Sequence, residues 1–408
     1  MIDFSTLQGL TIPEGVVTQI TDASGRVLWS AQPQMVTVTI KYKGGGAWFD
    51  HSELGEEVSD GTYQVSPGSL LTCWAQNGGI STDSTYVYFY VNGQERYYNY
   101  LTSPYQKASY NYTITTNVIV TYEKTESGYE YVYITEYPVG AVALEVEKIT
   151  SDTYAGETTY TGEQFILLDI YPKTNGTVKV TYGGLTKTIT DTSGAAEPNA
   201  QQVFFGTFNG VTDSVTTPTS GMLTIEGKCR GFGIGTFQNG SKTTNVGYCS
   251  CITGVSEFGE VESIPDYAFY KCNSIPNISF PEGIKSIGQY AVYKYYETTN
   301  IVSYDDLPVY DEIVIPSTVT SLGKFALCLE HLENLSSSQS THYHQAAKKI
   351  KVLAQTPPTI ADTLDYPLGS FNGDMDTCTI EVPKGCGEAY KAATGWSGYQ
   401  FRIVEASE

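Results

Sequence analysis

Residues 277–292 of this chain read NISFPEGIKSIGQYAV, and residues 312–327 repeat the pattern as EIVIPSTVTSLGKFAL. A shorter copy, VESIPDYAF, occupies residues 261–269. The serine of the shared Ser-Ile or Ser-Leu pair recurs at Ser263, Ser286 and Ser321, so the first step is 23 residues and the second is 35, which is 23 plus an insertion of 12. A period of about 20 to 29 residues with recurring Ile and Leu positions predicts a leucine-rich solenoid.

Each repeat is expected to contain one short strand. Ile278 and Phe280 should point inward and Ser279 outward, because successive side chains of a strand alternate between its two faces. Pro281 ends the strand, since it has no N–H group to donate. One such coil is too small to bury its own core, so neighbouring coils must stack. Solenoids of this kind usually bind other molecules, and the repeat therefore favours recognition.

The repeated residues resemble the BspA-type leucine-rich repeats, in which a motif V-x-S-I-G-x-x-A-F-x-x-C-x-x-L alternates with I-x-I-P. The resemblance extends over about residues 245–404 and includes closing repeats at residues 350–358 and 380–396. Three features depart from the family pattern. Val292 replaces the usual Phe, Tyr295 occupies the Cys position, and residues 332–349 are irregular. The resemblance implies a stacked solenoid and leaves the local register at these positions open.

The composition of the 408 residues favours β structure and a polar, acidic surface. The chain has 33 Tyr, only 16% charged residues and a net charge of −21. Enrichment in Tyr, Thr, Val and Gly predicts strands and tight turns. A uniformly acidic surface disfavours nucleic acid and anionic membranes as partners. No apolar run reaches the length of about 18 residues that a membrane span needs, so no membrane insertion is expected.

The N-terminal segment, residues 1–34, is predicted to form a docking hairpin. Residues 16–20 and 26–29 flank the turn sequence Asp22-Ala23-Ser24-Gly25. Residues 9–29 resemble the leader of structural proteins from phages and prophages of gut Firmicutes, which implies attachment to other virion proteins. The segment lacks a basic region and a long apolar region, so no signal peptide is expected. The resulting expectation is a virion protein assembled in the host cytoplasm.

The rest of the chain is predicted to be mostly β. The expected domains are an antiparallel β-sandwich (Ig-like) at residues 35–137, a second sandwich-like unit at 138–198, a β cap of the solenoid at 199–244 and the solenoid at 245–408. Asn92-Gly93 between two alternating runs predicts a hairpin in the first sandwich. Gly183-Gly184 predicts a second hairpin. Residues 203–205 are expected to pair with residues 222–225 in the cap.

No motif for catalysis, a cofactor or a metal stands out, so the chain is not expected to be an enzyme. The glycines of Gly231-Phe232-Gly233-Ile234-Gly235 are expected in turns. His342 and His344 could bind a metal together with His331, but we expect a solvated loop there. The eight cysteines favour reduced thiols; Cys249 and Cys272 would lie on adjacent coils, where a disulfide is the alternative.

Tyrosines give the best candidates for a binding site. The 12-residue insertion lies within residues 293–310, and insertions in repeat proteins often form the binding loops. The candidate ligand-binding residues are Tyr295, Tyr296, Tyr304, Asp305, Asp306 and Tyr310, which offer rings for sugars and acceptors for hydroxyl groups. The alternative is that these tyrosines pack the loop on the solenoid. Tyr97-Tyr98-Asn99-Tyr100 is a second candidate, with sheet packing or a subunit contact as its alternative.

These features together predict a phage tail fibre or receptor-binding protein, without catalytic activity, that binds a glycan or protein of the host cell surface through its solenoid. We expect a homo-oligomer, and analogy with tail fibres and spikes favours a trimer. Two other classes remain: a head or tail decoration protein without specific receptor binding, and a bacterial surface adhesin.

Overall fold

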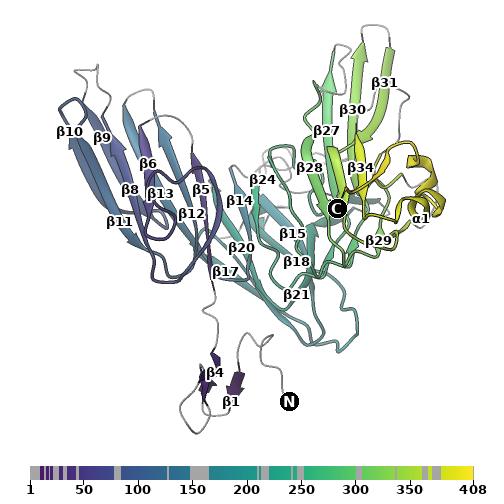
Figure 1. Ribbon diagram of the computed structural model, residues 1–408, viewed down its shortest axis with the longest axis horizontal. Helices are drawn as coiled ribbons and strands as arrows, with labels where there is room; N and C mark the ends of the chain where they lie inside the picture. The colour runs from purple at the N-terminus through teal and green to yellow at the C-terminus, as the bar shows by residue number, and fades with distance from the viewer. Residues whose placement is uncertain are drawn as a thin grey trace. The chain divides into compact units, whose positions relative to one another are not determined.

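The computed structural model describes residues 10–12, 15–17, 19–21, 27–30, 35–42, 46–77, 84–125, 128–147, 165–208, 211–212, 220–239, 242–245, 252–299, 306–335, 338–360, 366–369 and 378–407. The chain forms two compact units, Met1–Val139 and Gly140–Glu408. Both are built mostly of strands in several small sheets (Figure 1). Within the described residues, no helix is long and apolar enough to span a membrane.

The N-terminal segment forms two small antiparallel pairs rather than one hairpin. The strands are β1 Leu10–Ile12, β2 Gly15–Val17, β3 Gln19–Thr21 and β4 Val27–Ser30. The predicted pairing across the turn is confirmed for β3 and β4, where Ile20 lies opposite Trp29. Residues 16 and 17, predicted to belong to the same hairpin, pair instead with β1.

The rest of the first unit consists of two sheets that share one core. The strands are β5 Val36–Tyr42, β6 Ala47–His51, β7 Gly61–Val65, β8 Leu70–Gln76, β9 Thr85–Val91, β10 Gln94–Leu101, β11 Lys107–Thr113, β12 Asn117–Lys124 and β13 Tyr129–Tyr137. The larger sheet has the order β10-β9-β13-β12-β5-β7, and the smaller one β11-β8-β6. Alternating side chains such as Val87, Phe89, Val132 and Ile134 fill the core.

Pairing in the larger sheet is mixed. The predicted hairpin at Asn92-Gly93 is confirmed, and both residues have positive φ (51° and 74°), as a type I′ turn requires. However, β12 pairs with β5, and β13 with β9, in parallel. The expectation of an antiparallel sandwich is therefore wrong for these two strand pairs, because the strands of each pair are joined by long connections instead of tight turns. The Ig-like assignment stays a prediction.

The second unit begins with two sheets that flank the solenoid. The strands are β14 Val142–Val146, β15 Phe165–Pro172, β16 Thr177–Tyr182, β17 Leu185–Thr190, β18 Gln201–Phe208, β19 Val211–Thr212, β20 Gly221–Gly227, β21 Cys229–Ile234, β22 Thr236–Asn239, β23 Lys242–Asn245 and β24 Ile252–Ser256. The sheet orders are β17-β16-β20-β14-β24 and β19-β18-β15-β21. A separate hairpin joins β22 and β23. The predicted hairpin at Gly183-Gly184 is confirmed.

Strand pairing crosses the boundaries expected at residues 198/199 and 244/245. β20 lies between β16 and β14, and β24 pairs with β14. The predicted pairing of residues 203–205 with 222–225 is wrong: β18 pairs with β15, and β20 belongs to the other sheet. The reason is burial, because β15 is apolar along almost its whole length and needs a neighbour on each side. The second sandwich-like unit and the cap therefore form one structure.

The solenoid is held by two parallel ladders with one strand per coil. One ladder is β25 Ser263–Ile264, β26 Ser286–Ile287, β29 Ser321–Leu322 and β33 Thr359–Ile360. The other is β28 Tyr310–Ile315, β32 Ala347–Val352, β34 Thr379–Val382 and β35 Ile403–Glu405. Ser263 pairs with Ser286, which pairs with Ser321, as the repeat alignment predicts. Ile278 and Phe280 are buried and Ser279 is exposed as predicted, although residues 275–281 form no strand.

Glycines allow successive coils to approach closely. A Cβ atom on Gly323 would lie 2.4 Å from the backbone N of Gln289 in the preceding coil, and one on Gly288 would lie 2.6 Å from the N of Asp266. Gly231 and Gly233, expected in turns, instead lie in strand β21 against the first coil. A Cβ on Gly231 would come within 2.9 Å of the Ser263 carbonyl oxygen. These glycines fix the distance between backbones.

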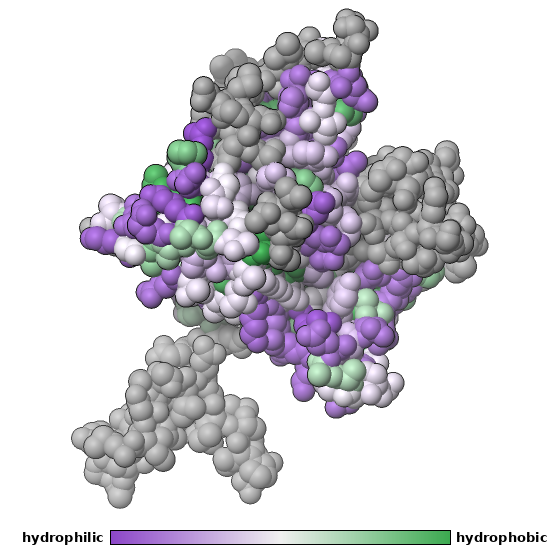
Figure 2. Space-filling model, turned by 90° about the vertical axis from the view of Figure 1, so that its right-hand side faces the viewer, coloured by the Kyte–Doolittle hydropathy of each residue, from purple (hydrophilic) through white to green (hydrophobic). Residues whose placement is uncertain are grey.

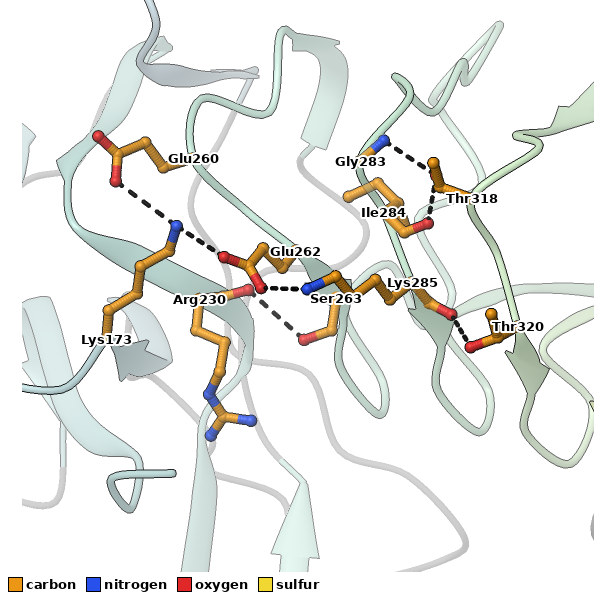
Figure 3. Close-up of polar contacts among 10 residues, drawn as sticks. All are labelled: Lys173, Arg230, Glu260, Glu262, Ser263, Gly283, Ile284, Lys285, Thr318 and Thr320. Atoms are coloured by element: carbon orange, nitrogen blue, oxygen red, sulfur yellow. Dashed lines mark hydrogen bonds and ion pairs between the residues drawn. The ribbon is translucent and has the colours of Figure 1, made fainter. Parts of the chain in front are cut away.

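Polar contacts also join the flanking sheets to the first coils (Figure 3). Lys173 Nζ contacts Glu262 Oε1 at 2.9 Å, and Lys285 Nζ of the next coil contacts Glu262 Oε2 at 3.1 Å. Hydrogen bonds from these lysines lower the pKa of Glu262. Further along, the Thr318 hydroxyl donates to the Ile284 carbonyl at 2.8 Å. The Lys173 contact thus joins the flanking sheets to the first coil, and the other two contacts join one coil to the next.

The C-terminal residues close the far end of the solenoid. They form helix α1 Gly387–Ala392, the 3-10 turn η4 Ser397–Tyr399 and strand β35. Trp396 is fully buried and donates from Nε1 to the Pro358 carbonyl at 2.8 Å. The Tyr390 hydroxyl donates to the Ala354 carbonyl at 2.6 Å. These large side chains bury the last coil.

We predict that Gly323→Ala destabilises the second unit by about 2 kcal/mol or more, because the added methyl group meets backbone atoms of the preceding coil. Gly398→Ala is the matched control, since no atom lies within 4 Å of its Cβ position. Chemical denaturation of both variants measures the effect. Equal stability of the two variants would contradict the role assigned to Gly323.

Candidate functional site

One aromatic position of the repeat has an unusual backbone conformation. Tyr267, Tyr290 and Phe325 occupy the same position in successive coils, with φ of 60°, 52° and 49°. Left-handed backbone is rare for bulky residues and costs about 1–2 kcal/mol each. Each of these residues is followed by an alanine that is fully buried in the coil. The repeated strain places one ring per coil on the same flank.

These rings form a continuous row, here called the aromatic ladder: Tyr267, Tyr290, Phe325 and Tyr343. Their ring centroids are separated by 5.2, 5.6 and 4.8 Å along the row. Tyr270 and Tyr293 form a second, more buried pair of parallel rings at 5.0 Å. Because neighbouring rings of the ladder are stacked or tilted against each other, the partly exposed members offer ring edges and hydroxyl groups to a ligand.

The insertion and the irregular stretch of the sequence are two parts of one structure, here called the projecting sheet. It consists of β27 Val292–Thr298, β30 Leu327–Leu335 and β31 Ser338–Gln345, in the order β27-β30-β31 (Figure 1). β27 and β30 pair in parallel because each strand leaves its coil at the same position of the repeat, directly after Ala291 and Ala326. β31 then returns antiparallel to β30. The projecting sheet therefore extends the aromatic ladder.

One face of the projecting sheet carries polar groups beside the ladder. The Tyr295 hydroxyl donates to Glu297 Oε2 at 3.1 Å, and the Tyr293 hydroxyl donates to Glu330 Oε2 at 2.9 Å. Lys271 Nζ lies 4.2 Å from the centre of the Tyr295 ring. The side chain of Asn273 bonds both the N–H and the carbonyl of Tyr295, at 3.0 and 2.8 Å, which covers the edge of β27.

The four candidate residues that the structure describes do not gather on one surface. Tyr295 and Tyr296 point to opposite faces of β27, and the Tyr296 ring lies 5.7 Å from that of His331. Asp306 is exposed, whereas Tyr310 is only 2% exposed and belongs to the core. Tyr304 and Asp305 lie outside the described residues. Among the described candidates, Tyr295 is the one placed beside the ladder.

Lys294 is a buried cation under the projecting sheet. Its Nζ donates to the Pro308 carbonyl at 3.0 Å and lies 3.9 Å from the centre of the Tyr310 ring. Burial lowers the pKa of Lys294 to about 8. The segment that contains Pro308 and Tyr310 thus packs against β27. For Tyr310, this confirms packing on the solenoid, which was the alternative to a role in ligand binding.

The histidines lie on the same face as Lys294. The solvated loop predicted around His342 and His344 is wrong, because both residues belong to strand β31. The ring of His331 lies 6.0 Å from His342 and 5.7 Å from His344. Burial lowers the pKa of His331. Within the described parts of the chain, no group of three or more His, Cys, Asp or Glu side chains is arranged to hold a metal ion.

The ladder residues were not among the sequence candidates. A signal was present, since an aromatic residue precedes the buried alanine in each copy: Tyr267-Ala268, Tyr290-Ala291 and Phe325-Ala326. Tyr343 gave no such signal, because it reaches the ladder through the β30–β31 hairpin. Cys249, which could form a disulfide with Cys272 in the alternative to reduced thiols, lies outside the described residues. Cys272 is a buried free thiol.

The stacked coils of the second unit form a leucine-rich solenoid. Residues 243–347 match the family model of the BspA type leucine-rich repeat region, in six copies. The chain therefore carries a BspA-type region there, and such repeats suggest surface binding or adhesion. Strands β32, β34 and β35 continue the same parallel sheet beyond the matched residues. A comparison with curated proteins finds no match.

We predict that wild-type protein gains stability relative to Lys294→Met as the pH rises from about 8 to about 10, by on the order of 2 kcal/mol. The folded-state pKa of about 8 lies below the ordinary value of 10.5, so the unfolded chain binds more protons in this window. Denaturation of both proteins at several pH values measures the difference. Lys228→Met, at an exposed position, should show no such trend; a flat difference for Lys294→Met would refute the burial effect.

Proposed function

We propose that this protein is a non-enzymatic adhesin that binds a cell-surface glycan through the aromatic ladder and the adjoining face of the projecting sheet. The observation that carries the proposal is the ladder itself, a row of rings repeated coil after coil at the cost of left-handed backbone. Strain of this kind clusters at functional sites. Solenoid repeats also present extended surfaces that suit long ligands.

The groups beside the ladder favour a polyhydroxylated ligand over an apolar one. The tyrosine hydroxyls of the ladder donate and accept hydrogen bonds, and carboxylates such as Glu297 and Glu330 accept them. Tyrosine supplies contact area with little loss of conformational entropy. On the face seen in Figure 2, hydrophilic residues predominate and apolar residues form small separate groups. A net charge of −21 favours a neutral glycan over an anionic one.

The more specific proposal is that the protein sits on a phage virion, attached through residues 1–34, and binds its bacterial host as an oligomer. Its support is the resemblance of residues 9–29 to phage structural proteins. Mass spectrometry of purified particles from a producing strain tests it. Detection among the virion proteins would support the receptor-binding or decoration roles, whereas detection only on the bacterial surface would favour a bacterial adhesin.

We predict that the double variant Tyr290→Asn/Tyr343→Thr binds the receptor glycan at least about tenfold more weakly, because one inner ring and one end ring of the ladder are lost. Asn tolerates the left-handed backbone of residue 290, so the fold is preserved. A glycan array followed by titration of the best ligand measures the affinity.

The matched control is Phe401→Ser, which removes an aromatic side chain that is 89% exposed but lies outside the ladder. Its affinity should equal that of wild type. If the ladder variant keeps full affinity while folding normally, the ligand binds elsewhere and the proposed site is wrong.

A further inference from the structure

Strand β10 forms an open edge of the larger sheet in the first unit. Its only strand partner in the described part of the chain is β9. It is eight residues long, and Tyr97, Tyr98 and Tyr100 are 40%, 56% and 42% exposed. A long edge strand with exposed large side chains is a template for pairing with another strand.

The tyrosines on the outer face of this sheet form rows of stacked rings that end at β10. In one row, Tyr100 lies 4.5 Å from Tyr86, which lies 5.2 Å from Tyr129. In the next row, Tyr98 lies 5.9 Å from Tyr88, which lies 5.5 Å from Tyr131. These separations are close to the spacing of about 4.8 Å between neighbouring strands. The last ring of each row, Tyr100 or Tyr98, therefore stacks on a ring of β9 and is partly exposed at the open edge.

Backbone hydrogen bonding shows which residues point to the open edge. The Tyr100 N–H donates to the side-chain oxygen of Asn99 at 2.8 Å, and the Thr102 N–H donates to Gln106 Oε1 at 2.9 Å. Both donors are satisfied by side chains instead of strand β9, so they face outward. By the alternation of an antiparallel pair, the backbone groups of Tyr98 face the same way. Two amide side chains thus occupy bonding positions that a further strand would take.

We propose that a second copy of this chain adds its own β10 to this edge, antiparallel, with a two-fold axis at Asn99. In that register, Tyr98 and Tyr100 form hydrogen-bonded pairs with the partner's Tyr100 and the partner's Tyr98. A two-fold axis makes the same patch serve both subunits, which is the commonest oligomer symmetry. The side chains of Asn99 swing away and release the edge N–H groups.

The pairing continues the tyrosine rows across the interface. The row that contains Tyr86 and Tyr100 meets the partner's Tyr98 at the ordinary strand spacing, so three rings become six. Aromatic cross-strand pairs are among the favourable contacts of a sheet. The strand itself carries one Glu and one Arg, and is therefore neutral within a chain of net charge −21. The acidic remainder of each copy repels the other, so the dimer should tighten as salt increases.

Sedimentation velocity of the full chain over a range of concentrations tests the proposal. The wild type should dimerise, and Tyr98→Lys/Tyr100→Lys should weaken the dimer at least about tenfold, because like charges then lie opposite each other. Tyr98→Glu/Tyr100→Glu should behave in the same way. An equimolar mixture of the two variants should recover the dimer, since each Lys then faces a Glu. Tyr105→Lys, at a 66% exposed tyrosine in the turn after β10, is the control and should dimerise normally.

A cysteine at the two-fold axis tests the register. Asn99 would lie in a non-hydrogen-bonded pair with its own copy, with Cα atoms about 4.5 Å apart, which a disulfide can bridge. Asn99→Cys should therefore cross-link under mild oxidation, above the background of wild type. Gln94→Cys should not, because the two copies of that residue would lie about 33 Å apart along the strands.

A chain that stays monomeric up to its solubility limit and does not cross-link through residue 99 would overturn the proposal. So would a dimer that persists in both charged variants, which would place the interface elsewhere. Neither result bears on glycan binding by the solenoid, because the ladder variants alter different residues.

Discussion

The second unit depends on how closely the backbones of successive coils approach. A single coil buries too little apolar surface to fold alone, so each must lie against the next with no side chain between them. Gly288 and Gly323 meet this condition between coils, and Gly231 meets it where β21 lies against the first coil. This spacing lets the Ser-Ile pairs form a parallel ladder, and it brings the aromatic rings into contact. The strained backbone at Tyr267, Tyr290 and Phe325 is held in place by the same stacking.

Much of this architecture could be predicted from the sequence, because the repeat encodes it locally. The pairing of Ser263, Ser286 and Ser321 follows from the alignment of the repeats, and Asn92-Gly93 and Gly183-Gly184 mark their own hairpins. The pairing of β20 with β14 and β16 could not be predicted, since it depends on which apolar strand finds a partner far along the chain. The sequence of β31 is polar and lacks the apolar alternation typical of a strand, so the sequence did not predict this strand.

The candidate site was predictable in place but only partly in detail. The 12-residue break does mark the structure that departs from the coil, and Tyr295 lies beside the ladder. The prediction of a loop does not reveal that Tyr295 and Tyr296 belong to one strand and point to opposite faces. It also does not reveal that Tyr310 is buried in the core. The sequence does not distinguish the ladder, because an aromatic residue before a buried alanine is also typical of an ordinary core position. Tyr267 and Tyr290 are partly exposed on left-handed backbone, which side-chain type alone does not reveal.

The closure of the solenoid at both ends has a mechanical consequence. In a repeat array with an open end, the terminal coil has a neighbour on one side alone, so a pulling force unfolds that coil first. Here the first coil is bound to β21 and shares one core with the flanking sheets, and the last coil is sealed by Trp396 and Tyr390. A force on any one coil therefore meets no free end and is shared with the flanking sheets and the closing residues.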